Sequence, residues 1–147
     1  MDERMIRMMQ LAGKGYICSQ IIMKLALELT GEENPSLVRA MAGPGYGCGS
    51  GAGTCGAMVG GCCLLALYAA KGTDDETTSE RLALMQSELS DWFSQRVGEK
   101  YGGIACETIV GGEGAATSIA ACGAIVSDTY AKTMEILASN GIDPTAS

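Results

Sequence analysis

An uncharged segment, residues 40–70, is the part of the chain that most restricts its fold. Its first part, residues 43–53, alternates glycine with one other residue, and its second part, residues 55–70, is mostly apolar. A membrane-spanning helix needs about 20 consecutive apolar residues, and a glycine-rich backbone cannot satisfy its own hydrogen bonds in lipid. The segment therefore predicts a glycine-rich loop that leads into a short buried helix and not a membrane span.

The spacing of apolar residues predicts helices along the whole chain. Thr54 is the expected N-cap of the helix that begins at Cys55, and Asp74 and Asp75 are the expected start of the helix that follows it. Alternation typical of a strand continues for no more than four residues anywhere. We therefore predict an all-α fold, a single compact helical bundle over residues 1–147 with a polar tail from about residue 141. Apolar residues recur with the period of a helix face in residues 5–12, 16–29, 35–41, 55–71, 74–98 and 115–139.

Charge and composition exclude several classes of function. The chain has 10 basic and 17 acidic residues, a formal charge of −7, and no cluster of Lys and Arg that could grip nucleic acid. Histidine is absent, which excludes Ser-His and Cys-His nucleophile pairs, His-ligated zinc and the C-x-x-C-H haem attachment. The N-terminus, residues 1–4, opens with acidic and basic residues and shows no secretory signal. We therefore expect a cytoplasmic protein whose cysteines stay reduced.

The seven cysteines carry the remaining chemistry. Their odd number and the lack of any C-x-x-C motif argue against a disulfide-stapled scaffold, a zinc ribbon and a thioredoxin-type site. Cys55 is the best nucleophile or ligand, because a helix N-terminus favours the thiolate and lowers its pKa. The glycine run before it can present N–H groups to an anion or to the sulfurs of a cluster, although without a lysine it is no P-loop.

A short motif occurs twice in the chain. The pattern C-G-A-x-V stands at residues 55–59 and again at residues 122–126. Glycine and alanine beside a cysteine let a neighbouring backbone or a cofactor approach a helix closely. Two interpretations follow: the two motifs face each other across one site, or each of them only permits tight packing between helices.

The order of the cysteines and of one glycine element resembles a known family. Cys18 stands before a helix, the element G-T-C-G-A-M-V-G follows at residues 53–60, and the segment Y-G-G-I-A-C ends at Cys106. Over about residues 15–126 this pattern resembles the C-GCAxxG-C-C family, which is named as redox-active, although this chain has Cys-Gly-Ala where the family label has Gly-Cys-Ala. The resemblance implies that the four family cysteines are Cys18, Cys55, Cys106 and Cys122. Cys48, Cys62 and Cys63 are additions to the pattern.

The resemblance also implies a cofactor. A related domain occurs in split-Soret-type cytochromes, which carry an iron–sulfur centre. Their haem does not transfer to this chain, because it lacks histidine and C-x-x-C-H. The first hypothesis is therefore that these four cysteines ligate an iron–sulfur cluster beside the glycine loop. Other residues expected to contact the cofactor are Gly53, Gly56 and Gly60, together with Cys48 or Cys62 as a replacement ligand or a lining of the entry.

Two further hypotheses remain open. In the second, the protein holds no cluster, and Cys55 attacks a disulfide while Cys18, Cys106 or Cys122 resolves it. In the third, the protein is a non-catalytic interaction domain whose cysteines are buried or bind structural zinc. The first two predict an electron carrier or redox accessory protein with a redox protein partner, more than an enzyme with its own substrate. The methionine-rich first helix has apolar surface to cover, which is consistent with a homodimer.

Overall fold

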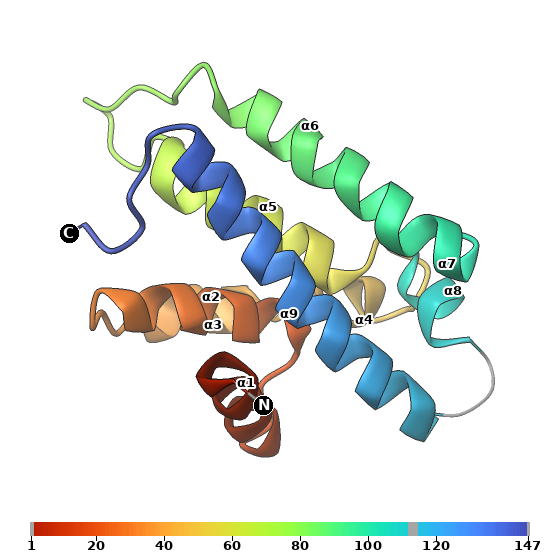
Figure 1. The fold of residues 1–147 in the computed structure, drawn as a ribbon. Helices are drawn as coiled ribbons and strands as arrows, with labels where there is room; N and C mark the ends of the chain where they lie inside the picture. The colour runs from red at the N-terminus through yellow and green to blue at the C-terminus, as the bar shows by residue number, and fades with distance from the viewer. Residues whose placement is uncertain (1, 112–114, 147) are drawn as a thin grey trace.

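The computed structural model describes residues 2–111 and 115–146, and this part of the chain is built from helices and connecting loops, of which residues 70–81 form a long one (Figure 1). The all-α prediction is confirmed. No helix in these two ranges is both long and apolar enough to cross a membrane. The elements are α1 (Glu3–Gly13), α2 (Cys18–Leu29), α3 (Pro35–Ala40), α4 (Gly45–Cys48), α5 (Gly56–Ala69), α6 (Leu82–Phe93), the π-helical turn η1 (Ser94–Gly98), α7 (Glu99–Tyr101), α8 (Cys106–Val110) and α9 (Ala115–Ser139).

Helix α5 is the centre of the fold, because it contacts α2, α4, α6 and α9 (Figure 1). Two adjacent glycines let these neighbours approach. A Cβ atom on Gly60 would lie 3.1 Å from the Cα of Ser19 in α2, and one on Gly61 would lie 2.7 Å from Leu89 Cδ2 of α6 and 2.9 Å from Thr133 Oγ1 of α9. The lack of a side chain at Gly60 therefore allows α2 to pack closely on α5, and the lack of one at Gly61 allows α6 and α9 to do so.

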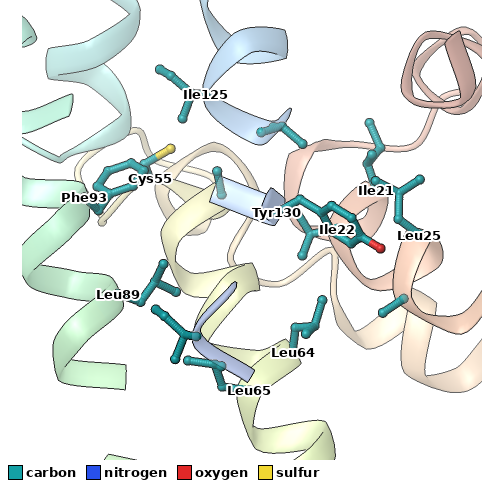
Figure 2. Close-up of a cluster of buried hydrophobic side chains, with 14 of the residues drawn as sticks. Ile21, Ile22, Leu25, Cys55, Leu64, Leu65, Leu89, Phe93, Ile125 and Tyr130 are labelled. Atoms are coloured by element: carbon teal, nitrogen blue, oxygen red, sulfur yellow. The ribbon is translucent and has the colours of Figure 1, made fainter. Parts of the chain in front are cut away.

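The core surrounds α5, whose residues are apolar on all faces as expected for a buried helix. Leu64, Leu65, Leu89 and Phe93 are completely or almost completely buried, and Cys55 belongs to the same cluster (Figure 2). A smaller cluster lies between α2 and α3. Cys55 is thus held by the core itself and not by a mobile surface segment.

The predicted helix start at Asp74 and Asp75 is wrong, since α6 begins at Leu82. Side chains in the intervening segment bond to nearby backbone groups and so compete with helix formation. The Glu76 carboxylate accepts hydrogen bonds from the N–H groups of Gly72 and Thr73 at 2.7 and 2.9 Å. These local bonds stabilise a turn where the apolar spacing alone predicted a helix.

Candidate functional site

A pair of backbone segments positions two of the cysteines. Thr54 and Ala105 form an isolated antiparallel bridge, in which the N–H of Cys55 donates to Ile104 O at 2.8 Å and the N–H of Cys106 donates to Gly53 O at 2.9 Å. Thr54 is therefore a bridge residue, and the prediction that it caps the helix is wrong, because Cys55 is the N-cap of α5. The bridge places Cys55 and Cys106 at the start of two different helices, side by side.

The glycine loop contains a left-handed turn. Tyr46, Gly47 and Cys48 have φ values of 53°, 59° and 60°, a conformation that residues with a Cβ rarely adopt. A Cβ atom on Gly47 would lie 2.7 Å from Gly53 O and 3.0 Å from the Cβ of Cys106. The turn therefore closes the loop on itself and against Cys106. Such unfavourable backbone in non-glycine residues is concentrated at functional sites.

Four cysteines line one cavity of about 430 Å³. Cys18 begins α2, Cys55 caps α5, Cys106 begins α8 and Cys122 lies in α9. The Cys-Gly pairs of both C-G-A motifs line the same cavity, which agrees with the interpretation that the motifs face each other across one site. The fold thus gathers cysteines from four separate segments around a common space.

Nearby backbone N–H groups favour the thiolate form of two of the cysteines. Hydrogen bonding from the N–H groups of Ser19, Tyr46 and Cys18 itself lowers the pKa of Cys18, and that from Ala57 and Met58 lowers the pKa of Cys55. The donors of Cys55 belong to the first turn of α5, whose free N–H groups the sequence had indicated as stabilisers of a thiolate. The left-handed turn contributes too, because Tyr46 is one of its residues.

The expected low pKa of Cys55 is wrong for the free thiol. Burial raises the pKa of Cys55 to about 11, and the hydrogen bonds from Ala57 and Met58 only partly oppose this effect. Burial also raises the pKa values of Cys18, Cys106 and Cys122. Desolvation of a thiolate raises the pKa by more than the N–H hydrogen bonds lower it. All four cysteines are therefore thiols at neutral pH unless a positively charged group binds them.

The thiols also lie within electrostatic reach of one another. Beyond the effect of burial, charge on Cys18 and Cys122 raises the pKa of Cys55, and charge on Cys18 and Cys106 raises the pKa of Cys122. None of the described residues that line the cavity is basic. Within the described ranges, no three Cys, Asp or Glu side chains come close enough together to hold a single metal ion. The four sulfurs are thus spread around the cavity instead of meeting at one point. Four thiolates there would repel one another without a positively charged group between them.

The raised pKa of Cys55 makes the stability of the reduced, metal-free protein depend on pH. Between pH 9 and about 11 the unfolded chain loses the Cys55 proton while the folded protein retains it, so the stabilisation present below pH 9 is lost as the pH rises. Two pH units correspond to about 2–3 kcal/mol of unfolding free energy. Urea unfolding at pH 8 and pH 11 should show this loss. The unfolding free energy of a Cys55→Ala variant should fall less over the same pH interval. Equal falls in the two proteins would contradict the assignment of this pH dependence to Cys55.

Comparison with known proteins agrees with the geometry. Residues 16–136 match the family described as "Putative redox-active protein (C_GCAxxG_C_C)". The chain belongs to this family. No curated protein and no solved structure matches it. The resemblance that the cysteine order indicated is confirmed, and redox activity is the function for which the family is named.

The other predicted site residues of this C-GCAxxG-C-C protein lie in several places. Gly56 lines the cavity, and a Cβ atom there would lie 2.6 Å from the Cys18 sulfur. Gly53 pairs with Gly47 in the loop, and Gly60 packs against α2 outside the cavity. Cys48 is exposed on the loop, and Cys62 packs against the main core. The structure therefore brings neither Cys48 nor Cys62 to the cavity.

Sequence patterns did not indicate the remaining wall of the cavity. Helix α1 contributes Met5, Met8, Met9 and Ala12 to it, and α2, α8 and α9 contribute further apolar residues. Tyr46 also lines it, although it is 62% exposed. The sequence showed the methionines as an apolar helix face, but only the tertiary contacts of α1 with α2 and α9 turn that face toward the sulfurs. A second cleft of about 710 Å³ between α1, α2 and α3 is lined by charged residues and by no cysteine among the described residues.

Proposed function

We propose that this C-GCAxxG-C-C protein carries electrons through an iron–sulfur cluster ligated by Cys18, Cys55, Cys106 and Cys122. The observation that carries the proposal is that these four cysteines, from four separate helices, line a single cavity. Four cysteine thiolates are the common ligand set of [2Fe–2S] and [4Fe–4S] clusters. The bound cluster would supply one-electron transfer.

The residues around the cavity fit such a group. Iron would provide the positive charge that the described lining residues lack, and metal coordination deprotonates thiols whose own pKa values are high. The N–H groups of Ser19, Tyr46, Ala57 and Met58 donate to ligand sulfurs, an arrangement that raises a cluster's reduction potential. The apolar side chains of α1 would lower the polarity around the cluster.

A cluster-free disulfide relay has less support from the same residues. A relay needs one cysteine that is a thiolate near neutral pH, and the four cavity thiols all have raised pKa values. Cys106 is only partly buried and begins a helix, and it is the best remaining candidate for attack on a disulfide. We propose that the electron donor and acceptor are other redox proteins of the cytoplasm.

Purification without oxygen and without chelators tests the proposal. We expect iron and acid-labile sulfide in near-stoichiometric amounts and a broad absorbance around 400 nm, which is the signature of a thiolate-ligated cluster. Protein prepared in this way that contains neither iron nor sulfide would overturn the proposal. If its free-thiol content then fell by two on mild oxidation, the disulfide relay would replace it.

A further inference from the structure

The cavity extends beyond the four sulfurs. Its volume of about 430 Å³ lies within the range of about 300–1,000 Å³ that small-molecule sites occupy. Besides the four cysteines, its lining includes Met5, Met8, Met9 and Ala12 of α1, and Ile21 of α2. These apolar side chains are well suited to contact with another molecule and are not among the proposed cluster ligands.

The chemistry of this wall restricts what can bind there. The described lining residues include no Lys, Arg, Asp or Glu, so a charged molecule would lose its hydration without gaining an ion pair. Methionine side chains are flexible and polarisable, and they make favourable contacts with aromatic rings. Tyr16 and Tyr46 add two aromatic rings to the same lining. The lining therefore favours an uncharged and largely apolar molecule, preferably one with a ring.

The cavity also has an accessible rim. Met9 is 58% exposed and Tyr46 is 62% exposed, yet both line the cavity. Part of the lining is therefore open to solvent, so a molecule can reach the cavity without unfolding the core.

We propose that the α1 side of this cavity binds a small, uncharged, largely apolar molecule next to the cysteine site. The position of this molecule beside a cluster rests on the proposed function. Binding itself rests only on the cavity and on the lack of charged side chains among its described lining residues. We expect both occupants to be held at the same time, because the lining continues past the four cysteines to five apolar residues of α1 and α2.

A matched pair of variants on α1 tests this proposal. Met9→Glu places a carboxylate at the rim of the cavity, whereas Ile6→Glu places one at an exposed position of the same helix that does not line the cavity. The probe is the uncharged aromatic amine N-phenyl-1-naphthylamine, measured by equilibrium dialysis against anaerobically purified protein and against iron-stripped protein. We expect saturable binding by the wild type and by Ile6→Glu, and a dissociation constant at least about tenfold larger for Met9→Glu.

Three results separate this proposal from the preceding one. Equal affinity of Met9→Glu and the wild type for the probe would overturn the proposed apolar site. Binding to iron-stripped protein that disappears in the iron-loaded protein would also overturn it, because the cluster would then need the whole cavity. A wild-type protein without iron that still binds the probe, with the same loss in Met9→Glu, would refute the cluster and support the apolar site.

Discussion

Replacing Cys55 with serine is expected to remove most of the iron and sulfide from the anaerobically purified protein, and with them the absorbance around 400 nm. Cys55 is the most buried of the proposed ligands in the core cluster, and its sulfur accepts two N–H groups from the first turn of α5. Serine keeps the size and the hydrogen bonds but offers an alcohol oxygen in place of the thiolate that iron prefers. We expect at least a tenfold decrease in iron per protein, measured by colorimetric iron and sulfide assays.

Cys63→Ser is the matched control for this experiment. Cys63 lies on the same helix, is partly buried, and packs against the small cluster between α2 and α3 instead of lining the cavity. The same chemical change there should leave the iron content unchanged. Circular dichroism of both variants establishes that each retains its helices. Equal iron content in Cys55→Ser and the wild type, or equal losses in the two variants, would contradict the assignment of the ligands.

Helix periodicity predicted most of the fold because helices depend mainly on local spacing. The expected segments at residues 16–29 and 35–41 agree with α2 and α3 to within a few residues. The prediction failed where side chains bond to nearby backbone, as Glu76 does, and where helices are as short as α4 and α8. A helix of four or five residues has too few positions to show a period.

The sequence was sufficient to name the four cysteines that line the cavity, but it did not indicate the other residues of the cavity wall. The family pattern selected Cys18, Cys55, Cys106 and Cys122, and the structure brings them to one cavity. The pairing of residues 53–55 with residues 104–106 is a long-range contact that no local pattern encodes. The pKa of Cys55 also depends on such contacts, because its burial comes from the packed core. The helix N-terminus alone predicted the wrong direction for this shift.

Gly56→Ala tests whether the glycine element shapes the site or only the packing of helices. A Cβ atom at position 56 would lie 2.6 Å from the Cys18 sulfur and 3.0 Å from Pro44 O, so Cys18 must move. Moving it weakens the hydrogen bonds that its sulfur accepts from Ser19 and Tyr46. Alanine is a better helix former than glycine by about 1 kcal/mol, but overpacking costs about 1–3 kcal/mol, so we expect a net loss of stability. We also expect a several-fold loss of iron.

Gly61→Ala separates these two effects, because it crowds the same helix without touching a cysteine or a donor to one. A Cβ atom there would lie 2.7 Å from Leu89 Cδ2 and 2.9 Å from Thr133 Oγ1, so α5 must move slightly relative to α6 and α9. Chemical denaturation should show both variants to be less stable than the wild type, while iron content should fall sharply only in Gly56→Ala. If iron content instead followed stability alone in the two variants, Gly56 would be a packing residue like Gly61. A selective loss of iron in Gly56→Ala would mean that this position is glycine in order to leave room for the sulfur of Cys18.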